Sequence, residues 1–318
     1  MILYPFKLSP VAKSAIWGGE RLRRDWHKHS DLDTVAETWE LTVREKENNT
    51  IQNGPLAGKT LADVLKNSEF DLVGSHSPAD RFPLLVKFID AADRLSVQVH
   101  PDDAFAAELE NDVGKTEMWY IVDADEGATI LYGLVEGATA EDLKRACAAG
   151  DPEPLLNRIE VKKGDCYFIP AGMPHAIGRG ILVAEIQQNC DLTYRLFDYN
   201  RRDKNGNLRE LHTEKAVRVT GTFTKSEVDA VRYAKGKGDA DLLANCPYFA
   251  VRRASFTEEL TLTVTTDSFC SLLFLDGEGV ACANGFTVPY KKGDSIFLPA
   301  DLGACILRGS GEVLISTL

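Results

Sequence analysis

The sequence predicts a mainly β protein that folds as two jelly-roll barrels with a few short helices. Three observations support this prediction. At 318 residues the chain is long enough for two domains. From position 82 onward, short apolar or alternating runs are separated by turn residues, as in all-β domains. The segment 162–171 is repeated at 291–300, a constant offset of 129 (291 − 162 = 129), which indicates duplication of one barrel.

The composition is that of an ordinary globular protein, with 44% hydrophobic and 26% charged residues. The N-terminal segment is too polar for a signal peptide, and no apolar run reaches membrane-spanning length, so we expect a cytoplasmic protein. The net charge of −12 disfavours nucleic acid and anionic membranes as partners. An anionic substrate would therefore need local cations at its site.

Seven cysteines are present, an odd number, and no pair has CxxC spacing. This pattern argues against a disulfide framework and against a thiolate zinc cluster. We expect most of them to be small buried residues.

The segment 1–60 is irregular, with a strand at 38–43 and a turn at Trp17-Gly18-Gly19. The strands become regular after position 82, where 84–90 reads as a buried strand and 95–100 alternates with period two. Residues 1–220 are predicted to form the first barrel with an N-terminal extension, and 221–318 an all-β second barrel of short strands. Further strands are expected at 118–122, 129–133, 166–169 and 182–187, helices at 61–65, 70–73, 139–148 (Thr139 as N-cap) and 153–158, and a polar turn at 201–207.

The repeat compares the two barrels at one position that matters for chemistry. Both copies have a Gly-Asp turn, an apolar strand and a Pro-Ala end. His175, just beyond the first copy, aligns with Ala304 in the second (304 − 129 = 175). The second barrel is therefore predicted to keep the fold without a metal site, which makes His175 dispensable for folding and a candidate ligand.

Three further polar residues accompany His175. Gln98 and His100 are two apart on a strand, so their side chains share a face. Glu117 stands at the mouth of the strand 118–122. Taken singly, each is explained by hydrogen bonding or solvation at a strand end. Together they form an oxygen and nitrogen ligand set that suits Zn²⁺ or another first-row divalent ion better than Mg²⁺ or Ca²⁺.

Longer strings in the chain resemble a known family. The segment from Gly164 to His175 resembles the second motif of the cupin superfamily. Several strings in consistent order resemble type I mannose-6-phosphate isomerase: PLLVK (83–87) with LSVQVHPD (95–102), GKTE (114–117), PAGMPHAIG (170–178), EIQQN (185–189) and TYRLFDY (193–199). Glu117 and His175 stand too close in the sequence to enclose the helical insertion of longer relatives, so the chain resembles the short bacterial form.

The resemblance implies an enzyme with two cupin barrels, of which only the first binds metal. It implies one Zn²⁺ per chain, held by Gln98, His100, Glu117 and His175. The reaction implied is the interconversion of mannose 6-phosphate and fructose 6-phosphate through an enediol or enediolate. The partner is then a small sugar phosphate, and we expect a monomer or a weak homodimer.

The family's active-site lysine and arginine match Lys115 and Arg195. Lys115 is two positions from Glu117 and shares its face, so it could bind phosphate or transfer a proton; the alternative is an exposed strand-end lysine. Arg195 could hold developing negative charge. Its alternative is a buried ion pair with Asp198 or Glu185.

The phosphate ligands and the general base stay open at this point. Candidates for phosphate binding are Ser96, Lys87 and Arg202, with Lys115 as a further cation. Candidates for the base are Glu185, Lys115 and a zinc-bound hydroxide. Two other functions remain: an iron-dependent cupin dioxygenase using two His and one Glu, and a non-catalytic sugar-binding cupin protein.

Overall fold

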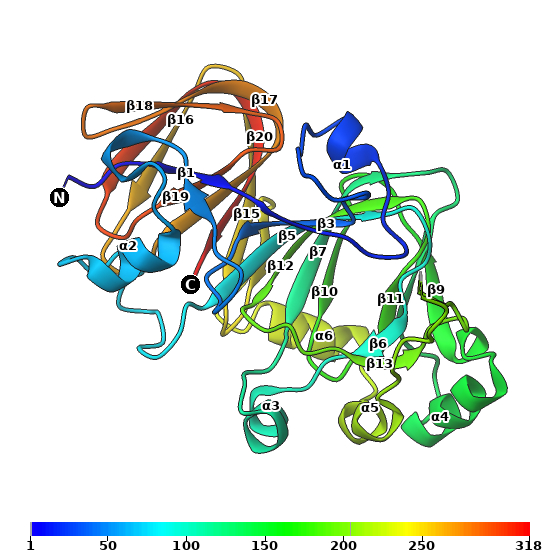
Figure 1. Ribbon diagram of the computed structural model, residues 1–318. Helices are drawn as coiled ribbons and strands as arrows, with labels where there is room; N and C mark the ends of the chain where they lie inside the picture. The colour runs from blue at the N-terminus through cyan, green and yellow to red at the C-terminus, as the bar shows by residue number, and fades with distance from the viewer. Residues whose placement is uncertain (1, 204) are drawn as a thin grey trace.

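The computed structural model describes residues 2–203 and 205–318 and consists of two β-barrel lobes with helices mainly at the lower end of the first (Figure 1). Its strands form three antiparallel sheets of nine, six and five strands. The predicted mainly β fold with short helices is confirmed. No helix in the described ranges is long and apolar enough to cross a membrane.

The first barrel is made of the six-stranded and the five-stranded sheet. All eight residues of β5 (Leu84–Ala91) and all eight of β12 (Ile181–Gln188) are buried, as expected for the apolar runs at 84–90 and 182–187. The six-stranded sheet has the order β10 (Cys166–Ile169), β7 (Glu117–Ala124), β12 (Ile181–Gln188), β5 (Leu84–Ala91), β3 (Glu37–Leu41), β2 (Val11–Lys13). The five-stranded sheet has the order β13 (Tyr194–Phe197), β6 (Val97–Val99), β11 (His175–Ile177), β8 (Thr129–Leu134), β9 (Leu156–Glu160).

The C-terminal barrel is one nine-stranded sheet. Two of its strands, β17 (Cys270–Ala283) and β20 (Gly303–Thr317), are 14 and 15 residues long and pair with each other, so they are exceptions to the mostly short strands expected here. The main path is β14 (Leu242–Asn245), β15 (Ala250–Phe256), β20 (Gly303–Thr317), β17 (Cys270–Ala283), β19 (Ser295–Leu298), β1 (Phe6–Ser9), β4 (Thr50–Ile51). Off this path, β16 (Glu259–Val264) pairs with β20, and β18 (Phe286–Lys291) pairs with β17.

The N-terminal extension is divided between the two barrels. Strand β1 pairs with β19, with Phe6 opposite Phe297, and β4 continues that sheet. Strands β2 and β3 instead extend the six-stranded sheet of the first barrel. The first segment of the chain therefore joins both lobes, whereas a division at position 220 assigns it to the first lobe alone.

The helices follow the sequence signals in part. The helix expected at 139–148 is α4 (Ala140–Ala149), and its N-cap Thr139 accepts a hydrogen bond from the backbone of Asp142. The segment 70–73 is not a helix, because the Asp71 carboxylate accepts two backbone hydrogen bonds in a turn. Where a helix was expected at 153–158, only a 3-10 turn, η2 (Glu153–Leu155), is formed, and strand β9 follows it directly. Helix α2 (Leu61–Asn67) confirms the helix expected at 61–65. The other helical segments are α1 (Arg21–Arg24), η1 (Gly54–Leu56), α3 (Asp103–Glu110), α5 (Thr213–Val219) and α6 (Lys225–Arg232).

The repeated segment has the same turn in both barrels. The Asp165 carboxylate accepts a hydrogen bond from the backbone of Lys162 at 2.9 Å, and Asp294 accepts one from Lys291 at the same distance. The copies diverge at Gly303, which has φ of 78°. There the paired residues differ in environment: Ala304 is exposed, whereas its aligned residue His175 is fully buried.

The cysteines behave as the sequence suggested. All seven are free, and five are buried.

Candidate metal centre and substrate pocket

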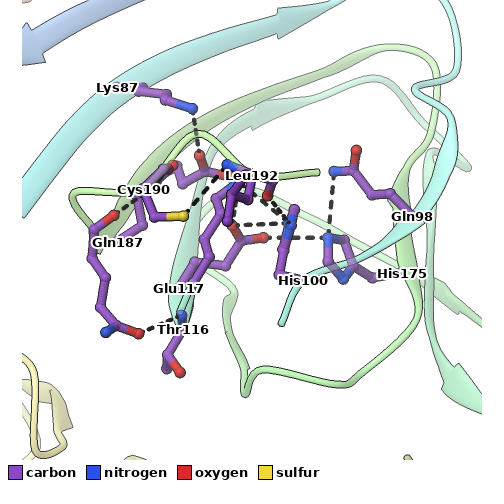
Figure 2. Close-up of polar contacts among 12 residues, drawn as sticks. Lys87, Gln98, His100, Thr116, Glu117, His175, Gln187, Cys190 and Leu192 are labelled. Carbon is purple, nitrogen blue, oxygen red and sulfur yellow. Dashed lines mark hydrogen bonds and ion pairs between the residues drawn. The ribbon is translucent and has the colours of Figure 1, made fainter. Parts of the chain in front are cut away.

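The four predicted ligands meet inside the first barrel (Figure 2). His175 in β11 lies directly opposite Gln98 in β6. Glu117 begins β7 on the facing sheet, and His100 follows the end of β6. One ligand atom from each of His100, Glu117 and His175 lies within 4.8 Å of the others.

Both histidines present the same nitrogen to this cluster. The His100 Nδ1–H donates to the Leu192 carbonyl at 2.9 Å, and the His175 Nδ1–H donates to the Met173 carbonyl at 2.8 Å. Their Nε2 atoms are then unprotonated and lie 3.5 Å and 3.4 Å from the Glu117 carboxylate. Burial lowers the pKa of His100 well below its usual value and that of His175 to about 4, so both rings are neutral ligands at physiological pH.

Glu117 is the acidic member of the cluster. Its side chain is fully buried, and neither oxygen has a hydrogen-bond partner of good geometry in the described residues; Lys115 Nζ lies 3.0 Å from Oε2. Burial and the negative charge of Glu185 raise its pKa to about 7. A buried carboxylate beside two bare imidazole nitrogens is costly unless a cation compensates them.

Gln98 completes a set that fits a divalent ion. Its amide lies 3.4 Å from His175 Nε2, and a half-turn of the amide presents the oxygen instead of the nitrogen. With Gln98 included, the donor set is two nitrogens, one carboxylate and one amide, which fits Zn²⁺.

Two glycines let the chain reach these positions. A Cβ on Gly114 would lie 2.5 Å from the backbone of Asp103, so only glycine lets the chain turn into Lys115 here. Gly172 has φ of 88°, and its N–H donates to the His100 carbonyl at 2.8 Å. The turn that delivers His175 is thereby tied to the end of the strand that carries His100.

A second polar row crosses the six-stranded sheet. Lys87, Glu185 and Trp119 are neighbours on β5, β12 and β7, so their side chains share one face. The Glu185 carboxylate lies 3.3 Å from Lys87 Nζ and accepts a hydrogen bond from the Trp119 indole at 2.9 Å. Burial alone would raise the pKa of Glu185, but the positive charges of Lys115 and Lys87 lower it, so Glu185 is ionised.

The metal centre opens into a pocket that both sheets line. Six residues singled out from the sequence lie there: Lys87, Ser96, Gln98, Lys115, Glu185 and Arg195. Lys115 is buried rather than an exposed strand-end lysine; burial disfavours its charge, but the carboxylates of Glu117 and Glu185 outweigh this and raise its pKa. Arg202 is not brought to this pocket: it is exposed and donates to the Gly206 carbonyl at 2.7 Å within the polar turn.

Four charged or polar residues of the pocket were missed by the sequence reasoning: Glu37, Asp191, Thr193 and Arg209. A signal existed for Glu37, because it lies two positions before Trp39 on an alternating strand, and Lys87 Nζ lies 3.7 Å from its carboxylate. Arg209 had no such signal, since it lies in the loop after β13.

Arg195 does not make either of the ion pairs that we considered for it. It donates from Nη1 to the Glu210 carbonyl at 2.8 Å, while its buried Nε has no hydrogen-bond partner in the described residues. Asp198 is instead occupied by Arg201 and Arg209. The Arg195 Nε–H group is therefore available to a ligand in this pocket beside the metal centre.

Known proteins resemble the chain over its whole length. Residues 5–129 match the model of the type I phosphomannose isomerase catalytic domain, and residues 240–318 match the cupin domain of mannose-6-phosphate isomerase. The chain is 38% identical to mannose-6-phosphate isomerase ManA of Bacillus subtilis (strain 168), covering 100% of both chains.

Solved structures agree with these matches. A crystal structure of the mannose 6-phosphate isomerase from Bacillus subtilis superposes with a TM-score of 0.86 at 36% identity, covering 99% of each chain. A mannose 6-phosphate isomerase bound with zinc and yttrium shares the fold, with a TM-score of 0.75 at 18% identity over 98% of each chain. The chain therefore belongs to the type I phosphomannose isomerase family of enzymes.

Proposed function

We propose that the protein interconverts mannose 6-phosphate and fructose 6-phosphate, with one Zn²⁺ held by Gln98, His100, Glu117 and His175. The observation that carries the metal assignment is the buried Glu117 carboxylate between two neutral imidazoles. The substrate assignment is supported by the full-length likeness to curated mannose-6-phosphate isomerases. The zinc reported in a structure of the same fold agrees with the donor set.

A bound zinc ion would act as a Lewis acid toward the O1/O2 edge of the sugar, where negative charge develops as the proton moves between C1 and C2. The chain's own cations share that task. Lys115 and Arg195 line the same pocket and can hold an enediolate by charge-assisted hydrogen bonds.

The protonation states separate the two candidate side chains for proton transfer. Glu185 is held as a carboxylate by Lys87 and the Trp119 indole, so it can accept a proton. Lys115 is held as an ammonium by Glu117, so it can donate a proton but not accept one. We therefore assign the role of general base to Glu185.

The test is a coupled assay on mannose 6-phosphate with wild type, Arg195→Ala and Arg202→Ala, each with and without a chelator. We expect the chelator to abolish turnover and stoichiometric Zn²⁺ to restore it. Arg195→Ala should lose about 100-fold or more of kcat/KM, since a charge-stabilising donor is removed. Arg202→Ala, on the exposed turn, is the matched control and should behave as wild type.

Three outcomes would contradict the proposal. Full activity after complete metal removal would exclude the metal's role. An iron-loaded protein that consumes oxygen and ignores mannose 6-phosphate would indicate the dioxygenase. Zinc-replete protein that binds both sugar phosphates without turning either over would indicate a non-catalytic sugar-binding protein.

A further inference from the structure

Four cations line the pocket in the described part of the chain, and they fall into two groups. Lys87 and Lys115 are occupied by carboxylates next to the metal centre, at 3.3 Å from Glu185 and 3.0 Å from Glu117. Arg195 and Arg209 form the second group and make no contact with those carboxylates. The two arginines are therefore the cations that remain available to a ligand.

The arginine group lies at a defined place relative to the metal centre. Arg195 on β13 pairs with Gln98 on β6, and Gln98 pairs with His175 on β11. These three residues form one row across the sheet, with their side chains on the same face. Two strand spacings separate the backbones of Arg195 and His175, which is roughly 10 Å. Arg195 is therefore positioned for the reacting end of the sugar, and Arg209, which lines the same pocket, is the arginine left for the phosphate.

Arg209 is held in place by a buried carboxylate. Asp198, whose side chain is 5% exposed, accepts hydrogen bonds from Arg209 Nε at 2.7 Å and from Arg209 Nη2. Asp198 also accepts one from Arg201 Nη2 at 2.6 Å. The Arg209 Nη1 group makes no hydrogen bond to the described residues. Asp198 thus fixes one edge of the guanidinium and leaves the other free to bind a ligand in the pocket.

The charges around Asp198 are unbalanced. A single buried carboxylate faces Arg201 and Arg209, with Arg195 nearby; Arg201 has a further partner in Asp93, at 3.1 Å. Burial and the positive charge of Arg209 lower the pKa of Arg195, which shows that the two guanidiniums repel each other. A phosphate dianion bound at Arg209 would offset this repulsion. In a chain with net charge −12, the arginine group also supplies the local cations that an anionic substrate needs.

We propose that Arg209, oriented by Asp198, binds the phosphate group of the substrate and makes the enzyme selective for phosphorylated sugars. The proposal rests on the proposed function for the identity of the substrate. It replaces Arg202, one of the candidate phosphate ligands considered from the sequence, by an arginine of the same loop that reaches the pocket. Arg209 binds substrate, and Asp198 is a positioning residue.

The experiment compares Arg209→Gln, Arg209→Lys and Asp198→Asn with Arg202→Gln as matched control from the same loop. Zinc-loaded proteins are assayed for kcat and KM on mannose 6-phosphate, for kcat/KM on unphosphorylated mannose, and for binding of inorganic phosphate by calorimetry. Thermal unfolding of each variant confirms that it is folded.

We expect Arg209→Gln to raise KM for mannose 6-phosphate by about 10- to 100-fold, the usual effect of losing a charge-assisted contact to phosphate. Its kcat should change by less than about threefold, because the metal end of the pocket is unaltered. Phosphate affinity should fall by a similar factor to KM, while turnover of mannose stays the same. Arg209→Lys keeps the charge and should recover part of the loss. Asp198→Asn should shift KM in the same direction, and Arg202→Gln should match wild type.

Two results would overturn the inference. One is unchanged KM and unchanged phosphate binding in folded Arg209→Gln. The other is an equal loss on mannose and on mannose 6-phosphate, which would mean that Arg209 only supports the structure. Failure of the proposed function would give a different result, because the wild type would not isomerise mannose 6-phosphate. Calorimetry on wild type and Arg209→Gln would still show whether Arg209 binds phosphate.

Discussion

The two barrels of this protein share a turn and a strand, but the neighbouring strands carry buried charged residues in the first barrel and uncharged ones at the equivalent positions in the second. In both, a Gly-Asp turn at positive φ leads into a short strand, β10 or β19, with the same backbone hydrogen bond to the aspartate. The strand register extends the comparison. Glu117 lies opposite Ile169 in the first barrel, and Cys270 lies opposite Leu298 in the second.

The polar row of the first barrel has an apolar equivalent in the second. By the same register, Trp119 and Glu185 correspond to Leu272 and Ile315. A jelly roll is thus complete without charged residues at these positions. We therefore infer that the buried charges of the first barrel serve chemistry rather than stability, as expected where a site departs from the rules of core packing.

The largest effect should come from making the first barrel resemble the second at the ligand itself. His175→Ala removes one metal ligand, and we expect activity to fall by about 1000-fold or more, since several kcal/mol of transition-state stabilisation are lost. The fold should persist by circular dichroism, because the second barrel forms the same Gly-Asp turn and following strand without a histidine. Ala304→His, at the aligned exposed position, is the control and should leave the zinc content at one per chain. Loss of folding in His175→Ala would contradict the comparison.

The next effect concerns the buried pair of Lys87 and Glu185. Lys87→Met leaves a buried carboxylate without its partner and should lower the free energy of unfolding by about 3–5 kcal/mol. Adding Glu185→Leu makes the row apolar, as at Ile315, and should recover much of that loss. Urea unfolding of metal-free proteins measures both values. Additive losses in the double variant would show that the first barrel depends on its charges for stability.

The smallest effect concerns the turn. Gly172 and Asp301 are aligned (301 − 129 = 172), and both have positive φ, 88° and 62°. Gly172→Ala should cost about 1–3 kcal/mol, because a Cβ there would lie 2.8 Å from the Val219 carbonyl as well as being strained. Asp301→Gly should change stability by less than about 1 kcal/mol. Thermal unfolding of the two variants checks the difference, and equal losses would mean that the two turns are equally constrained.

The sequence was sufficient to predict that Gln98, His100 and His175 lie together, because local rules govern their placement. Period-two alternation placed Gln98 and His100 on one face, and the repeat singled out His175. The sequence was not sufficient to identify which arginine lines the pocket away from the metal ligands. Arg202 and Arg209 lie in the same loop, and only the contact of Arg209 with Asp198 decides which of them faces the pocket.

Two features of the fold also lay beyond local patterns. The pairing of β1 with β19 joins strands from near the two ends of the chain, and no run of residues indicates it. Ala304 is exposed because the backbone of the second copy takes a different direction at Gly303, where φ is 78°. The repeat predicted the turn, but not the direction of the chain after it.

The pairing of Phe6 with Phe297 also sets the order of events during synthesis. The first strand leaves the ribosome early, and nearly the whole chain must follow before its partner emerges. At typical rates of translation, this strand waits roughly 15–60 s for the sheet that it completes. Its apolar residues and open hydrogen-bonding edge are exposed for that interval. The edge of β1 is therefore open to aggregation until β19 has been synthesised.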